Sequence, residues 1–172
     1  FPTDYPYTPP RVEYCTNDGT TRFNPNLYRQ GKVCLSILNT WAGDSWTACQ
    51  TIRSVLLQLL LLFNDRPLLN EPGILETHSD FDTYHEIIRF KNIEYSIYQQ
   101  LSLKIPNPFI SLFSAEIKKH MDNTFKDIYE NCRLLKKQYS TSKILTTTLY
   151  RMTVTIDYST LLNKLDLLKE TF

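Results

Sequence analysis

The stretch of sequence that decides the fold is Arg22-Phe-Asn-Pro-Asn-Leu-Tyr-Arg-Gln-Gly-Lys-Val-Cys-Leu-Ser-Ile-Leu-Asn-Thr-Trp41. It places the thiol of Cys34 in an irregular segment, eight residues after Asn26, whose amide can donate two hydrogen bonds. Reactive groups tend to lie on irregular loops held by a packed scaffold, and a thiol reacts there if it is reachable and ionises. The alternative is that residues 33–35 form a buried apolar triplet, which the residue pattern alone favours.

Length and composition describe an ordinary globular protein. The 172 residues are 42% hydrophobic and 22% charged, which excludes collagen-like and wholly disordered chains. A net charge of +1 provides no broad field for nucleic acid or an acidic membrane. The longest apolar stretch, residues 55–63, is too short for a bilayer, which needs about 20 residues. We therefore expect neither nucleic acid nor membrane as a partner.

The cysteine pattern indicates neither a metal site nor a disulfide framework. The four cysteines include no CxxC pair and no cysteine–histidine cluster with zinc spacing. We expect no metal and no cofactor, and reduced thiols in the cytosol or nucleus. Cys15 and Cys132 are expected in the core, and Cys49 as an inert residue.

Prolines and glycines are concentrated in the first half, which predicts turns and short extended pieces followed by helices. We expect a strand at residues 11–16, a turn at 17–19 and irregular structure over 22–46. The segment 141–156 is either a linker or extended. Helices are predicted at residues 51–63 (buried, with Thr51 as its cap), 81–101, 109–139 and 158–168. The helix at 81–101 has an apolar stripe formed by Tyr84, Ile87, Ile88, Tyr95 and Tyr98.

Three blocks of sequence, in order, resemble the ubiquitin-conjugating enzyme family. The first is Phe1-Pro-x-x-Tyr-Pro-x-x-Pro-Pro10. The second is Asn24-Pro-Asn26 followed by Cys34 in Gly-Lys-Val-Cys-Leu-Ser-Ile-Leu. The third is Trp46, the leucine-rich segment, and Asn70-Glu-Pro72. Within the family, the Arg-Phe-Asn-Pro-Asn sequence, the Thr-Trp-x-Gly insertion and the Asn-Glu-Pro-Gly turn resemble the Z-type conjugating enzyme.

The resemblance implies an α+β, ubiquitin-conjugating (UBC-like) fold. The catalytic core would cover residues 1–101 and a helical C-terminal extension residues 102–172. The family's fold opens with a helix and three strands before the tyrosine–proline block, and none of these precedes Phe1. We therefore expect an N-terminally truncated domain.

The resemblance also implies the chemistry. Cys34 would be the nucleophile that accepts ubiquitin or a related modifier as a thioester from an activating enzyme. Asn26 matches the asparagine that steadies the active-site loop or donates to the oxyanion, and Glu71 matches the acid that orients the incoming lysine. Asn24 stands where the family usually has a histidine of mainly structural importance.

Two loops match the surfaces that face a ubiquitin ligase in the family, with Tyr7 and Thr8 on one and Ala48 and Cys49 on the other. The second loop lacks the usual proline, which weakens the expectation of ordinary ligase binding. The implied partners are the modifier, the activating enzyme, a ligase and substrate lysines.

Two other functions stay open. The chain could be a non-catalytic interaction module of the same fold that binds modifiers or partner proteins, although such relatives usually lack the cysteine. A cysteine hydrolase would need a histidine beside Cys34, and none lies near it in the sequence.

Overall fold

The computed structural model describes residues 1–102 and 112–169. The chain divides into two compact units, Phe1–His85 and Glu86–Phe172, which we describe separately. The boundary expected after residue 101 stays a prediction. No helix in the described ranges is long and apolar enough to cross a membrane.

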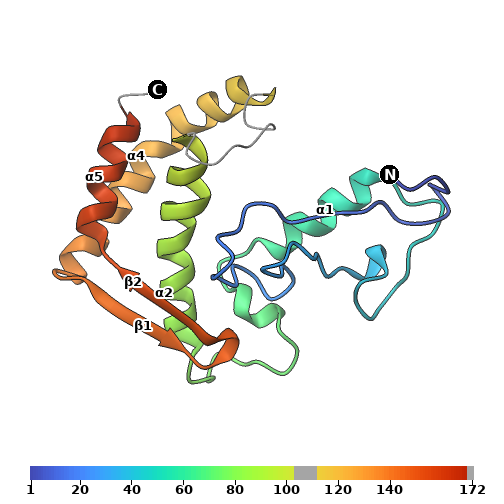
Figure 1. The fold of residues 1–172 in the computed structure, drawn as a ribbon, viewed down its shortest axis with the longest axis horizontal. Helices are drawn as coiled ribbons and strands as arrows, with labels where there is room; N and C mark the ends of the chain where they lie inside the picture. Colours follow the sequence, from blue (N-terminus) through green and yellow to red (C-terminus); the bar gives the residue numbers. More distant parts are fainter. Residues whose placement is uncertain (103–111, 170–172) are drawn as a thin grey trace. The chain divides into compact units, whose positions relative to one another are not determined.

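The first unit is largely irregular (Figure 1). Before the helix that begins at Phe81 and continues into the second unit, it has one α-helix and two short 3₁₀ helices. These are η1 (Ser36–Leu38), α1 (Ile52–Leu62) and η2 (Pro67–Asn70). The expected turn at residues 17–19 is confirmed, because the Gly19 N–H donates to Asn17 Oδ1 and Gly19 has a φ of 72°. Asp18 caps the following residues through the N–H groups of Thr20 and Thr21.

The prediction of a strand at residues 11–16 is wrong. This segment makes a single isolated bridge, between Glu13 and Lys32, and the Tyr14 N–H donates to the Gly31 carbonyl at 2.7 Å. Gly31 has a φ of 90°, and a Cβ there would lie 2.8 Å from Glu13 Cγ. Because Gly31 is left-handed, the backbone turns there, and residues 11–16 have no extended neighbour with which to form a regular ladder of hydrogen bonds.

A small apolar core holds the irregular segments together. Trp46 and Val55 are buried in it with five residues that flank the Asn26 and Cys34 positions, namely Leu27, Val33, Leu35, Ile37 and Leu38. Leu59 and Leu62 of α1 pack against the same core. Burial of these side chains fixes the ends of loops that have little regular secondary structure of their own.

Helix α1 forms as expected, but the expectation that it is buried is wrong. Thr51 and Ser54 make a reciprocal capping box at its start. Val55 is fully buried, whereas Leu56, Leu57, Leu60 and Leu61 are 53–73% exposed. A helix of 11 residues that meets a core along one side buries one stripe, however apolar its other faces are.

The helix expected over residues 81–101 is confirmed as α2 (Phe81–Lys91) and the π-helix η3 (Asn92–Gln99). The apolar stripe predicted for it is buried throughout, at Tyr84, Ile87, Ile88, Tyr95 and Tyr98. The change from α to π geometry was not predicted.

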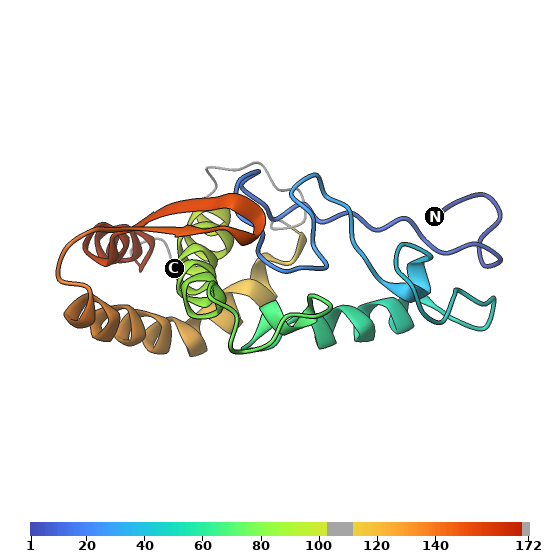
Figure 2. The ribbon, with the colours of Figure 1, turned by 90° about the horizontal axis from the view of Figure 1, so that it is seen from below.

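The second unit joins η3 to two helices and a hairpin, and α4 (Ser114–Gln138) lies alongside α5 (Tyr158–Lys169) (Figures 1 and 2). The helix predicted over 109–139 is confirmed where it can be seen, since residues 109–111 lie outside the described ranges. Helix α5 begins behind Asp157, which accepts hydrogen bonds from the N–H groups of Ser159 and Thr160. The Tyr158 ring packs edge-on against Phe90, with centroids 5.4 Å apart.

The segment 141–156 is extended, which confirms one of its two alternatives. Strands β1 (Lys143–Thr147) and β2 (Met152–Ile156) pair antiparallel, with Lys143 opposite Ile156. Leu145, Met152 and Ile156 are buried. The C-terminal part is therefore helical with an added hairpin.

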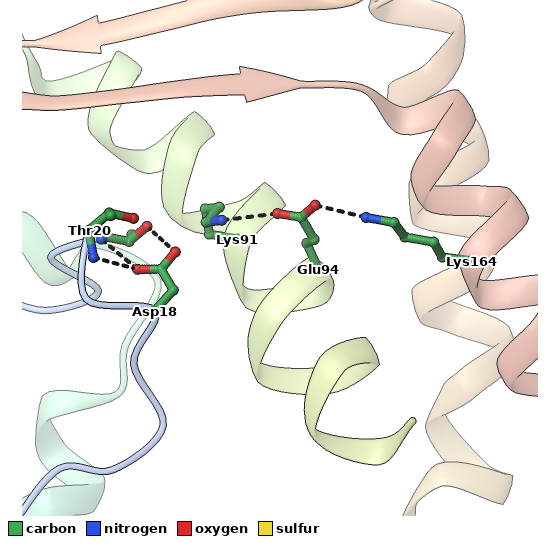
Figure 3. A network of polar contacts seen from close by, with 6 residues as sticks. Asp18, Thr20, Lys91, Glu94 and Lys164 are labelled. Atoms are coloured by element: carbon green, nitrogen blue, oxygen red, sulfur yellow. Dashed lines mark hydrogen bonds and ion pairs between the residues drawn. The ribbon is translucent and has the colours of Figure 1, made fainter. Parts of the chain in front are cut away.

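Glu94 holds two elements of the second unit together (Figure 3). Its carboxylate accepts hydrogen bonds from Lys91 Nζ and from Lys164 Nζ of α5, each at 3.0 Å. Burial by itself raises the pKa of Glu94, but the hydrogen bonds and charges of the two lysines outweigh it, so the pKa lies below the ordinary value of 4.5.

Replacing Glu94 by glutamine should lower the free energy of unfolding by about 1–2 kcal/mol at neutral pH. Because the folded pKa is lowered, this stabilisation is complete above the unfolded value of 4.5 and is lost as the pH falls through the folded value. Urea unfolding followed by circular dichroism should therefore show the full difference between wild type and Glu94→Gln at about pH 7, and a smaller difference at a pH below 4.5.

The matched control is Glu130→Gln, since Glu130 pairs with Arg133 on the surface, where both side chains are more than half exposed. It should change the free energy of unfolding by less than about 0.5 kcal/mol at either pH. An equal effect of both substitutions would contradict the role given to Glu94.

Candidate functional site

Asn26 and Cys34 are joined by two hydrogen bonds. The Cys34 N–H donates to the Asn26 carbonyl at 2.8 Å, and Asn26 Nδ2 donates to the Cys34 carbonyl at 2.9 Å. Both residues are buried. The eight-residue spacing noted in the sequence thus closes a loop whose two ends are held by backbone and side chain together. The Asn26 amide supports the cysteine loop here.

Thr40 closes the segment that follows the cysteine. Its hydroxyl donates to the Val33 carbonyl at 2.7 Å and accepts from the Leu35 N–H at 3.0 Å, on either side of Cys34. Asn39 has a φ of 56°, and its Oδ1 accepts from the Trp46 N–H. These contacts fix a tight turn in which Cys34 itself is 1% exposed.

Asn24 links the cysteine loop to the end of α1. Its Oδ1 accepts from the Asn26 N–H at 2.9 Å, and its Nδ2 donates to the Leu62 carbonyl at 2.8 Å. The side chain is almost fully buried, at 2% exposure. A helix's last carbonyl groups lack intrahelical partners, so this bond satisfies one of them. Asn24 has the structural role that was expected of it.

Arg22 supports the same segment from its other side. The guanidinium donates to the carbonyl groups of Asn24 and Pro25, at 3.2 and 2.6 Å, and stacks 3.4 Å from the centre of the Tyr28 ring. The Arg22 carbonyl accepts from the buried Tyr84 hydroxyl at 2.8 Å. The buried arginine therefore provides a donor for the Pro25 carbonyl and a second donor for the Asn24 carbonyl, which also accepts from the Leu27 N–H.

Glu71 lies on a turn that hydrogen bonds connect to Asn24 and to the end of α1. Asn70, the preceding residue, places its Nδ2 3.3 Å from the Leu62 carbonyl and 3.5 Å from Asn24 Oδ1. The Glu71 N–H donates to Leu68, and its carbonyl accepts from Ile74. Three asparagines thus connect the Glu71 turn to the Cys34 loop.

The two loops expected to face a ligase lie next to each other. Trp46 Nε1 donates to the Pro6 carbonyl at 2.7 Å, which joins the start of the second loop to the first. Tyr7 is 81% exposed, Ala48 and Cys49 are exposed, and the Thr8 hydroxyl donates to Asp4.

The second of these loops is closed without a proline. The Gln50 side-chain oxygen accepts from the Thr47 N–H, and the Gln50 N–H donates to the Thr47 carbonyl. Two hydrogen bonds between Thr47 and Gln50 therefore close the turn in which the family usually has a proline.

The remaining candidates for chemistry are not gathered into a second site. Among the described residues no three of His, Cys, Asp and Glu lie close enough to hold a metal ion. His78 Nδ1 accepts from the Asp80 N–H, and His85 Nδ1 lies 2.7 Å from the Phe81 carbonyl, so both rings bond within their own segment.

All four cysteines are free thiols. Cys132 is fully buried, as expected, and burial raises its pKa to about 11. Cys15 is exposed, so its expected place in the core is wrong. Val12 and Tyr14 pack against the core, whereas Arg11, Glu13 and Cys15, which alternate with them, are exposed.

Sequence reasoning did not single out Thr40, Asn70, Arg22 and Tyr84 as supports of the site. Thr40, Asn70 and Arg22 lie within quoted motifs, whereas Tyr84 lies outside them. Their partners, however, are backbone carbonyl and N–H groups whose directions depend on the folded loop.

Comparison with known proteins identifies the family. The profile of the ubiquitin-conjugating enzyme family matches residues 1–93, just over half of the 172. The chain therefore belongs to the ubiquitin-conjugating enzyme family, and the α+β class expected from the resemblance is confirmed. That the domain is N-terminally truncated stays a prediction.

Individual relatives point to one branch of the family. The chain is similar to ubiquitin-conjugating enzyme E2 Z from Xenopus tropicalis and from Homo sapiens, at 41% identity over 132 residues in each case. It is also similar to probable ubiquitin-conjugating enzyme protein 17 from Caenorhabditis elegans, at 36% identity over 143 residues. The matches cover 75–80% of this chain, but 36–40% of the two E2 Z proteins and 18% of the nematode protein.

The four cysteines differ in burial, so their rates of alkylation should differ. Under native conditions iodoacetamide should modify Cys15 and Cys49 first, Cys34 more slowly, and Cys132 last. The raised pKa leaves Cys132 with about a hundredfold less thiolate than an ordinary cysteine. Peptide mapping by mass spectrometry measures each rate, and denaturant should make the four equal. Native labelling of Cys34 as fast as Cys15 would contradict the burial of the loop.

Proposed function

We propose that this chain is the thiol-bearing part of a ubiquitin-conjugating enzyme that carries ubiquitin or a ubiquitin-like modifier as a thioester on Cys34. The observation that carries the proposal is the pair of hydrogen bonds between Asn26 and Cys34, at the spacing that the family motif requires. Membership of the family supports the same conclusion.

The proposed chemistry is two acyl transfers. The Cys34 thiolate attacks the thioester carbonyl that the activating enzyme presents, a new carbon–sulfur bond forms, and the activating enzyme's thiolate leaves. A lysine amine of a substrate, or a ligase, then takes the acyl group from Cys34. The Cys34 thiolate departs, and the amine loses its proton to a nearby base. Covalent relay divides one difficult step into two easier ones.

Asn26 and Glu71 serve this relay in different ways. In the observed geometry Asn26 Nδ2 is bonded to the Cys34 carbonyl, which favours its role as loop support over that of an oxyanion donor. Glu71, on a turn connected to the loop, would orient the incoming lysine and accept its proton. Tyr7, Thr8, Ala48 and Cys49 would contact a ligase.

The proposed setting is the cytosol or nucleus, where four free thiols persist. The proposed partners are the modifier, its activating enzyme, a ligase and substrate proteins. No cofactor is proposed.

The test is thioester formation. The full-length protein is incubated with activating enzyme, ATP and modifier, and run on a non-reducing gel. A shifted band that disappears with reductant and with Cys34→Ala is expected, because the thiol is the acceptor. Cys49→Ala is the matched control and should charge normally. No thioester with any modifier, or a normal band from Cys34→Ala, would rule the proposal out.

Asn26→Ala separates loop support from oxyanion stabilisation. It removes the Nδ2 bond and leaves the Cys34 carbonyl without that donor, so the free energy of unfolding should fall by about 1–3 kcal/mol together with the charging rate. Denaturant unfolding and single-turnover charging measure the two effects. Unchanged unfolding, with transfer slowed about a hundredfold or more, would instead assign Asn26 to the oxyanion.

A second candidate function is a non-catalytic module of the same fold that binds modifier or partner proteins. The 1% exposure of Cys34 favours it, because a thiol must reach the surface to form a thioester. The gel assay distinguishes the two: a module of this kind would bind the modifier without a reductant-sensitive band.

A further inference from the structure

The Asn24 amide uses its acceptor and its donor on different segments. Its Oδ1 accepts from the Asn26 N–H, within the cysteine loop, and its Nδ2 donates to the Leu62 carbonyl, at the end of α1. With 2% exposure it has little access to water that could replace either bond. Its orientation is therefore fixed by both segments at once.

The Asn70 amide joins this arrangement at its edge. Its Nδ2 lies 3.3 Å from the Leu62 carbonyl and 3.5 Å from Asn24 Oδ1, while its Oδ1 lies 3.4 Å from Asn64 Nδ2. These are long contacts, so each one is weak. Together they hold the residue that immediately precedes Glu71.

We propose that Asn24 and Asn70 act as a positioning pair, which sets where Glu71 lies relative to Cys34 during transfer to lysine. This inference rests on the proposed function. Asn24 hydrogen-bonds both the cysteine loop and the Leu62 carbonyl. Asn70 contacts Asn24 and the same carbonyl, and it directly precedes Glu71, so a shift of the loop would move the Glu71 turn. Transfer depends on placing the amine and the thioester to within about an ångström, so a small shift of the turn slows it.

The chemistry of the pair requires an amide at position 70. A donor must face the Leu62 carbonyl and Asn24 Oδ1, and an acceptor must face Asn64. Aspartate keeps the size and the acceptor but places a negative charge against two oxygen atoms. Asn70→Asp should therefore disturb the turn at least as much as Asn70→Ala.

The experiment loads the full-length protein with modifier, stops charging, and follows discharge of the thioester onto free lysine over a range of lysine concentrations. Asn70→Ala, Asn70→Asp and Asn24→Ala should raise the lysine concentration for half-maximal discharge by about tenfold. Charging by the activating enzyme should stay within about twofold for the two Asn70 variants, because it does not use Glu71. Asn17→Ala removes a turn-closing amide elsewhere in the unit, at Tyr14 and Gly19, and should change neither step.

The decisive comparison uses a Glu71→Ala background. If Asn70 acts through Glu71, Asn70→Ala adds little to the defect of Glu71→Ala, whereas independent roles would multiply. Full multiplication, or discharge unaffected by both Asn70 variants, would overturn the positioning role while wild-type charging leaves the proposed function standing. Absence of any wild-type thioester would overturn the proposed function and the inference with it.

Discussion

The hydrogen bonds between Asn26 and Cys34 determine the arrangement of the surrounding loops. This part of the chain has almost no strand pairing, so its buried backbone groups must find partners elsewhere. Side chains provide them: the Asn26 amide and the Thr40 hydroxyl on either side of the cysteine, and the Arg22 guanidinium over the preceding turn. Asn26 thus joins the two ends of the loop that carries Cys34.

The supporting side chains are mostly neutral amides, and this has a chemical consequence. Asn24 and Asn70 do not titrate near neutral pH, whereas a histidine at position 24, as is usual in the family, changes charge there. The hydrogen bonds that connect the cysteine loop with the end of α1 therefore keep the same donors and acceptors across the physiological range.

Much of the fold could be predicted from the sequence where the signal is local. The periodic stripe of α2 and η3, the cap at Thr51 and the turn at Asn17 were predicted correctly because neighbouring residues decide them. Predictions failed where the conformation or burial of a segment depends on residues distant in the sequence. The segment 11–16 found no ladder, and α1 exposes leucines because it meets the core on one side. The motif spacing predicted that Asn26 lies beside Cys34, and the apolar pattern of residues 33–35 favoured burial of Cys34, but neither indicated that Asn70 connects to Asn24.

The central claim, that the loop held by Asn26 presents the acceptor thiol, is tested most directly by mapping the attached modifier. The charged full-length protein is digested under non-reducing, mildly acidic conditions, and the peptides are sequenced by mass spectrometry. We expect the modifier's C-terminal residues on the peptide containing Cys34, joined through sulfur and lost on treatment with hydroxylamine. Attachment at Cys15 or Cys49, the two exposed thiols, or at a lysine with Cys34 unmodified, would contradict the claim.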